Sequence, residues 1–336
     1  MYTNQDLENA VEKQIFTQDS VNEFKKEVIK QKNFIPVDEE NFKLIGSLND
    51  IFVVIASSLL MFSVLWLTVG ENFFSYLLFV GLAWGLSELF VRQKKMALPG
   101  IVLLVYFVGG VSVGILNVLD GDSALFLAFL SGIFASILHW KRFRVPITLA
   151  VGVASLLGSL VSLCLAVFDV RMFEISEYGW IFTLISGISV FLFAMHWDSA
   201  DRNREGYKSD VAFWLHLLAA PLIVHSLFSQ ISGLNVADGD SVLYIVAVLF
   251  VYLFLTALSL AVNRRVFMIS SLVYALFALE SLLDEYGSID SYEALSGVLM
   301  GTLLLGISVY WHEAREKIVH VLPSVITKYL PNISVQ

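Results

Sequence analysis

Residues 145–168 read VPITLAVGVASLLGSLVSLCLAVF, a stretch without a single charged side chain. A helix rises 1.5 Å per residue, so about 20 apolar residues cross a hydrocarbon layer of roughly 30 Å. This stretch is long enough to do so, and it predicts a transmembrane helix. The rest of the chain is similar in composition: 57% of the 336 residues are hydrophobic and only 15% are charged. That balance lies outside the range of soluble proteins.

Nine further apolar runs of similar length flank this stretch, each separated from the next by a short polar or Gly-rich break. Together they predict an all-α, polytopic membrane protein with ten transmembrane helices within residues 49–312. The ten runs are 51–70, 73–91, 99–119, 123–138, 145–168, 180–196, 211–232, 241–262, 266–283 and 294–311.

The distribution of Lys and Arg predicts which side of the membrane each loop occupies, because basic residues are retained in the cytoplasm. With ten helices, twenty of the twenty-one basic residues fall on the side of the N-terminus. The other side holds only Arg171 together with twelve acidic residues. One helix more or fewer would destroy this separation, so we expect both termini on the cytoplasmic side of the membrane. The acidic outer loops would attract cations, although acids tolerated where Lys and Arg are excluded give the same pattern.

The two ends of the chain are more polar. Residues 1–48 predict a cytoplasmic helical hairpin, in which Thr3 with Asp6 and Ser20 with Glu23 have the spacing of helix-capping boxes. Residues 313–336 predict a tail lying along the inner leaflet, bent at Pro323, with an apolar face. Neither end can bury a core of its own, so we expect each to pack on the membrane domain or on a protein partner. The apolar face of the tail consists of Ile318, Leu322, Val325, Ile326 and Tyr329.

A ten-residue block occurs twice. LNVLDGDSAL at 116–125 recurs as LNVADGDSVL at 234–243, in outer loops four predicted helices apart. An even separation predicts parallel repeats about an axis along the membrane normal. The block can form an Asp-Gly turn that caps the following helix. Alternatively, its oxygen atoms could bind a cation. The candidate ligands are Asn117, Asp120, Asp122 and Ser123 in the first copy, and Asn235, Asp238, Asp240 and Ser241 in the second.

Two acidic residues lie within predicted transmembrane helices, where ionisable groups are costly and are candidates for a substrate pathway. Glu88 has Arg92 one helical turn later, so an ion pair near the interface also explains it. Glu280 lies about one turn from the outer surface, which its carboxylate could reach.

The run at 211–232 contains His216, Pro221 and His225. Pro221 removes a backbone donor and predicts a kink or local unwinding, a feature that borders binding sites in transporters. A histidine hydrogen-bonded to a neighbouring helix is the alternative interpretation.

Three pairs of glycines four residues apart predict close helix contacts: Gly81/Gly85, Gly110/Gly114 and Gly297/Gly301. Cys164, the single cysteine, excludes an internal disulfide and a cysteine metal cluster. Phosphate-binding loops, zinc-protease helices and disulfide-exchange motifs are absent from the sequence, and we expect no cofactor, no nucleic-acid partner and no soluble-type catalysis. Any metal remains open.

The layout of a charged N-terminal segment, ten short-looped helices and a basic tail with Leu322-Pro323 and Leu330-Pro331 resembles uncharacterised polytopic inner-membrane proteins of bacteria. This resemblance implies a location in the inner membrane of a bacterial cell, and it carries over no functional residues. Two functions are considered first, and an intramembrane enzyme is a further alternative. The first is a transporter or permease for a small solute or ion, which the ten helices, the repeat and the Pro221 helix favour. The second is a scaffold or sensor that acts through partners at the N-terminal segment or the tail.

Overall fold

The computed structural model describes most of the chain, and every regular element in the described part is a helix. The chain divides into two compact units, residues 1–42 with 333–336 and residues 43–332. The described residues are 7, 10–11, 13–24, 48–67, 73–119, 122–168, 175–202, 204, 206–238, 241–286 and 292–331.

In the first unit, residues 18–24 are helical. The helix begins after Thr17, whose hydroxyl oxygen accepts a hydrogen bond from the backbone N–H of Ser20 at 3.2 Å. The N-terminal cap is therefore Thr17, three residues before the expected Ser20. The other expected cap, Thr3 with Asp6, lies outside the described residues.

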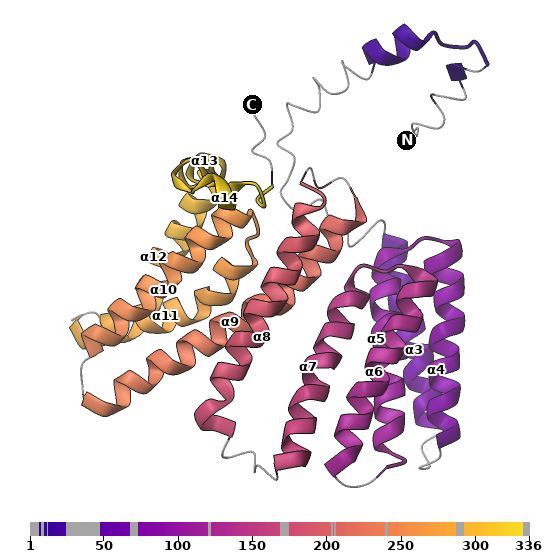
Figure 1. The fold of residues 1–336 in the computed structure, drawn as a ribbon, viewed down its shortest axis with the longest axis horizontal. Coiled ribbons are helices and arrows are strands. Elements are labelled where there is room, and N and C mark those ends of the chain that lie inside the picture. The colour runs from indigo at the N-terminus through magenta and orange to yellow at the C-terminus, as the bar shows by residue number, and fades with distance from the viewer. Residues whose placement is uncertain are drawn as a thin grey trace. The chain divides into compact units, whose positions relative to one another are not determined.

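The second unit holds a helix at each of the ten apolar runs (Figure 1). The helical bounds follow hydropathy because a helix satisfies all of its backbone polar groups internally, as a lipid environment requires. These helices are α3 (Leu48–Leu67), α4 (Phe73–Ser87) continued by the π-helix η1 (Glu88–Gln93), α5 (Ala97–Leu116), α6 (Asp122–Phe143), α7 (Ile147–Phe168), α8 (Ile175–Ser199), α9 (Tyr207–Asp238), α10 (Ser241–Val262), α11 (Val266–Tyr286) and α12 (Tyr292–Val309).

The tail forms two further helices, α13 (Trp311–Val321) and α14 (Ser324–Thr327). Leu322 between them is extended, with φ −75° and ψ 143°. Pro323 follows and cannot continue α13, so the predicted bend in the tail is present.

Within the described residues, seven helices are long and apolar enough to cross a membrane: α3, α4 with η1, α5, α6, α7, α8 and α9. The described apolar segments of α10, α11 and α12 are shorter than those of the seven helices. They are Val246–Val262, Val266–Phe277 and Gly297–Val309. Large apolar side chains are widely exposed, for example Trp66 at 81% and Phe250 at 70%. A protein in water would bury such groups, whereas lipid solvates them. The chain has the structure of a multi-pass membrane protein.

Helix α9 is the central element of the second half of this unit, since it packs against α7, α8, α10 and α11. It is also the most buried candidate span, at 56% compared with 44% for α5. Its buried side includes Ala219, Ala220 and Val224, whose small side chains allow its neighbours to approach closely.

The glycines of the helix contacts are only partly those expected. A Cβ added at Gly110 would lie 2.8 Å from the ring of Phe79, and one at Gly114 would lie 3.0 Å from Tyr76, so the α4–α5 contact is confirmed. Gly81, Gly85, Gly297 and Gly301 face open space, and the prediction for them is wrong. The spacing of glycines gives a small helix face, but it does not say whether a partner helix lies there.

The two copies of the repeated block differ in their backbone. In the first copy α5 ends at Leu116, whereas in the second α9 continues to Asp238, the position equivalent to Asp120. The second outer turn is correspondingly shorter. The parallel repeat therefore remains a prediction based on sequence.

Candidate functional site

Asp198 is the centre of a buried cluster of charged residues. It lies in the last turn of α8, directly after the apolar run that forms this helix, and its side chain is 0% exposed. A buried carboxylate requires charged or hydrogen-bonding partners, because desolvation of an isolated charge costs several kcal/mol or more.

Arg264, in the turn between α10 and α11, is the principal partner of Asp198. Its Nη2 donates to Asp198 Oδ1 at 2.8 Å, and also to the backbone oxygen and the hydroxyl of Ser209 at 3.0 and 3.1 Å. The turn that carries Arg264 is itself fixed, since the Ser259 hydroxyl donates to the Arg264 carbonyl. The guanidinium is 3% exposed, so this ion pair is buried on both sides.

Arg204, in the loop between α8 and α9, is the second cation of the cluster. Its Nη2 lies 3.4 Å from Asp198 Oδ2 and donates to the carbonyl of Val262 at 2.8 Å. Its Nη1 donates to the carbonyl of Asn263 at 2.8 Å. Arg204 and Asn263 both have φ values of 55–58°, a left-handed conformation that costs a non-glycine residue about 1 kcal/mol or more. The bonds between the two turns hold this conformation in place.

His216, one of the sequence candidates, belongs to the same cluster. Its Nε2 lies 3.5 Å from Asp198 Oδ2, and its side chain is fully buried. Phe191 and Phe267 enclose the imidazole, with ring centroids 5.5 and 5.8 Å away.

Two guanidinium groups share the Asp198 carboxylate, and Arg264 also interacts electrostatically with Asp210. Burial and then the neighbouring Arg264 lower the pKa of Arg204 to about 10, and Arg204 therefore keeps its charge at neutral pH. Backbone carbonyls of Ser209, Val262 and Asn263 accept further hydrogen bonds from the two guanidinium groups. Asp198, Arg264 and His216 are all buried, so a solute cannot reach the cluster. The cluster joins α8, the loop between α8 and α9, and the turn between α10 and α11, and we call it the lock.

Further hydrogen bonds connect the loops of the lock to the tail. Arg202 Nε donates to the carbonyl of Leu330 at 2.9 Å, and Arg315 Nη2 donates to the carbonyl of Pro331 at 2.8 Å. The indole N–H of Trp311 donates to Asn263 Oδ1 at 2.8 Å. The guanidinium of Arg265 lies over the Trp311 ring, 4.9 Å from its centroid. The loops after α8 and α10 and the end of the tail therefore lie on the same side of this unit.

His225 and Pro221 lie on the opposite flank of α9 from the cluster. Leu217, Pro221 and His225 follow each other at intervals of four residues, and all three are exposed. His225 Nδ1 lies within hydrogen-bonding distance of the Tyr274 hydroxyl of α11, at 3.0 Å. Helix α9 is continuous through Pro221, so local unwinding is not observed.

Glu88 forms two ion pairs. One joins it to Arg92 at 3.2 Å, as the sequence spacing indicated, and the other joins it to Arg142 of α6 at 2.5 Å. Glu88 begins the π-helix η1, and the pair with Arg142 links η1 to the end of α6.

The candidate cation ligands are only partly described. The side-chain amide of Asn117 donates to the carbonyl of Val113 at 2.9 Å and so completes the end of α5, in agreement with a turn-and-cap role. Ser123 is exposed in the first turn of α6. In the described part of the chain, no three His, Cys, Asp or Glu residues gather as metal ligands. Asp120 and Asp240, and the side chains of Asp122, Asn235, Asp238, Ser241 and Glu280, lie outside the described residues.

The sequence alone does not identify Asp198 as the centre of a cluster. In the sequence, Arg204 and Arg264 count only as basic residues that predict the topology. The available signal was an acid directly after an apolar run, at His196-Trp197-Asp198, but its partner Arg264 is 66 residues away. Only the packing of α8, α9 and α10 brings the two together.

Comparisons with protein-family models, with curated proteins and with solved structures found no match for this chain.

Proposed function

We propose that this chain is a ten-span protein of the bacterial inner membrane that acts as a scaffold or sensor through protein partners bound at its cytoplasmic face. The observation that carries the proposal is the buried lock of Asp198, Arg204 and Arg264, with its extension to the tail. It fixes two loops and the tail into one surface, as a docking face requires.

The orientation is supported by charge and by contacts. The loop after α8, the turn after α10 and the tail are basic, and they contact each other. Basic loops on one side are expected to lie in the cytoplasm. Helices α10 to α12 coincide with the last three apolar runs, and this supports counting them as spans in spite of the shorter apolar segments described in them.

Two of the polar groups expected on a transport pathway have charged neighbours instead. His216 Nε2 lies 3.5 Å from Asp198 in the buried lock, and Glu88 is paired with two arginines. A polar residue with such partners is explained without a solute. The exposed apolar residues of the tail, among them Val321 at 85%, are available for a partner.

Transport is the second candidate, and one observation favours it. In a lipid environment the exposed stripe of Leu217, Pro221 and His225 presents an imidazole, together with a carbonyl at Leu217 that lacks its usual donor because residue 221 is proline. Such groups are tolerated where water reaches them. A water path along α9 would favour a permease.

Labelling of single cysteines separates the two functions. Cys164 is exposed, so it is first replaced by Ala. Leu217→Cys and His225→Cys are then tested with a membrane-impermeant thiol reagent in intact vesicles. Ile185→Cys on α8 is the exposed, lipid-facing control, and Lys94→Cys in the turn after η1 is the accessible control. The scaffold function predicts that positions 217 and 225 stay as unreactive as 185. Labelling at the rate of position 94 would overturn it in favour of transport.

A crosslinking experiment tests the scaffold directly. A photoreactive residue at Val321 of the full-length protein should give one defined protein adduct in cells. The adduct should be lost when Arg202→Met releases the end of the tail from the loop after α8, while the amount of protein in the membrane stays the same. An adduct pattern that is unchanged by Arg202→Met would contradict the role of the locked tail.

A further inference from the structure

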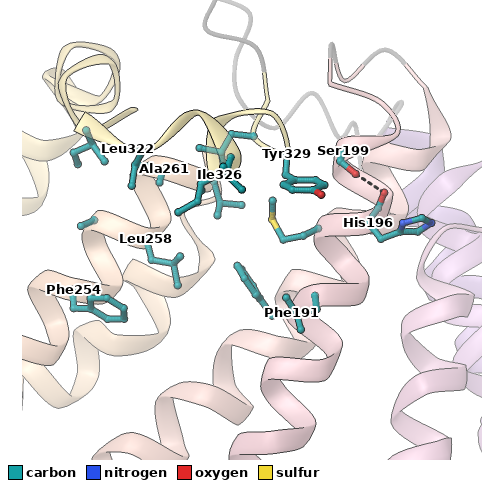
Figure 2. Close-up of a pocket in the computed structure, with 16 residues that line it drawn as sticks. Phe191, His196, Ser199, Phe254, Leu258, Ala261, Leu322, Ile326 and Tyr329 are labelled. Atoms are coloured by element: carbon teal, nitrogen blue, oxygen red, sulfur yellow. Dashed lines mark hydrogen bonds between the residues drawn. The ribbon is translucent and has the colours of Figure 1, made fainter. Parts of the chain in front are cut away.

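An apolar groove of about 630 Å³ lies beneath the tail, between α8 and α10. Figure 2 shows Leu322, Ile326 and Tyr329 of the tail along one side of this space, with Leu258 of α10 and Phe191 of α8 on the other. The tail residues expected to lie on the inner leaflet, Ile318, Leu322, Val325, Ile326 and Tyr329, all line it. The predicted apolar face of the tail therefore covers a groove as well as meeting the bilayer.

Hydrogen bonds hold the end of the tail beside the groove. Arg202, in the loop after α8, donates to the carbonyl of Leu330, and Arg315 of α13 donates to the carbonyl of Pro331. The extended Leu322 and Pro323 separate α13 from α14, so the tail cannot settle as one straight helix onto α8 and α10. A volume of this size matches small-molecule binding sites, and its apolar walls fit hydrocarbon.

Two cationic side chains adjoin residues that line the groove, and we call this edge its rim. Arg202 donates to the carbonyls of Leu330 at 2.9 Å and Thr327 at 3.5 Å, and Leu330 lines the groove. The exposed Lys328 lies over the ring of Tyr329, another lining residue, with Nζ 4.7 Å from the centroid. Among the described residues, no carboxylate forms an ion pair with either cation.

Asp198 and Asp201, two acids near Arg202 in the sequence, have other partners. Asp198 is bound by Arg264 and Arg204, and Asp201 accepts a hydrogen bond from the backbone N–H of Gly206 at 2.8 Å. An apolar groove with a cationic rim, in a chain that spans a membrane, matches an anionic phospholipid, with its chains in the groove and its phosphate at the rim. We propose that this groove binds one anionic phospholipid of the adjoining leaflet, whose phosphate is held by Arg202 and Lys328.

This inference does not depend on the scaffold function, because it rests on the groove and its rim alone. The test uses the full-length protein in detergent, with phosphatidylglycerol or phosphatidylcholine of identical acyl chains added in separate titrations. Native mass spectrometry measures the fraction of protein that carries one lipid. We expect phosphatidylglycerol to bind at least tenfold more tightly than phosphatidylcholine.

Two variants test the two parts of the site separately. Lys328→Gln leaves the tail anchor intact and should weaken phosphatidylglycerol binding about fivefold without affecting phosphatidylcholine. Ala257→Phe fills the half-buried wall of the groove and should weaken both lipids. The matched controls are Lys317→Gln on the exposed side of α13 and Ala166→Phe on the exposed side of α7, and both should bind as the wild type does. Equal affinity for the two lipids, or unchanged phosphatidylglycerol binding by both test variants, would overturn the proposal.

Discussion

Asp198 shows how a single residue determines whether charges can be buried in this protein. Its carboxylate is shared by Arg264, Arg204 and His216, so the removal of Asp198 takes the shared carboxylate from all three. Buried ion pairs add little net stability when complete, but they are costly to break. The importance of the cluster therefore lies in fixing one arrangement of the loops.

Replacement of Asp198 by Ala should lower the free energy of unfolding by about 3 kcal/mol, since two buried guanidinium groups lose their carboxylate. Asp201→Ala is the matched control. Asp201 accepts a hydrogen bond from the backbone N–H of Gly206 at 2.8 Å, and the loss of this bond should cost about 1 kcal/mol. Unfolding of the full-length protein in mixed micelles, followed by tryptophan fluorescence, gives both values. Equal losses for the two variants would mean that Asp198 is no more than an ordinary hydrogen-bonding residue.

At the scale of elements, α8 and α9 approach each other most closely at Gly187. A Cβ there would lie 2.8 Å from Ile223 Cγ1 and 3.0 Å from the backbone nitrogen of Ile223. Backbone cannot move away as a flexible side chain can, so the two helices would have to separate.

Gly187→Ala should therefore destabilise the protein by roughly 1–3 kcal/mol, the range typical of overpacking. Gly81→Ala, at a glycine that faces open space, should be neutral or stabilising by up to about 1 kcal/mol, because Ala is the better helix former. The same unfolding measurement applies to both variants. If Gly81→Ala lowers the stability as much as Gly187→Ala does, a helix of another molecule covers Gly81.

The tail helices depend on a few anchors. Arg315 is buried and donates to the carbonyl of Pro331, so Arg315→Met keeps most of the side-chain volume but removes this bond. We expect trypsin to cleave after Lys328 several times faster in this variant. Glu316→Gln, at an exposed neighbouring position, should leave the cleavage rate unchanged. If the two variants are cleaved at the same rate, the Arg315 bond does not hold the tail.

At the scale of the whole molecule, the prediction concerns topology. Reporter fusions at 93–97, 141–144, 202–208 and after 312 should report the cytoplasm. Fusions at 120–122, 171–178, 238–240 and 286–291 should report the outer side. The physical reason is the retention of Lys and Arg on the cytoplasmic side. Two consecutive loops on the same side would exclude ten spans.

The positions of the helices could be predicted from sequence because lipid imposes a length and a composition on each of them separately. The run at 145–168 coincides with α7, Ile147–Phe168, for this reason. The contacts between helices could not be predicted in the same way. The spacing of Gly81 and Gly85 resembles that of Gly110 and Gly114, yet only the second pair meets a neighbour. His216 was a candidate for its chemistry, but its environment depends on Asp198 and on two phenylalanines from other helices.

The buried lock also bears on the order in which the chain is made. Synthesis delivers Asp198 and Arg204 first, then His216, and Arg264 only after α9 and α10 have left the ribosome. Until then the carboxylate of Asp198 lacks Arg264, its principal partner, and the packing of α8 and α9 is incomplete. A nascent chain that stops before Arg264 thus exposes charge at the edge of the bilayer, the kind of defect by which membrane quality control distinguishes incomplete chains from finished ones. The charged residues of the lock all lie between α8 and the turn after α10, so the lock can first close when that segment is complete.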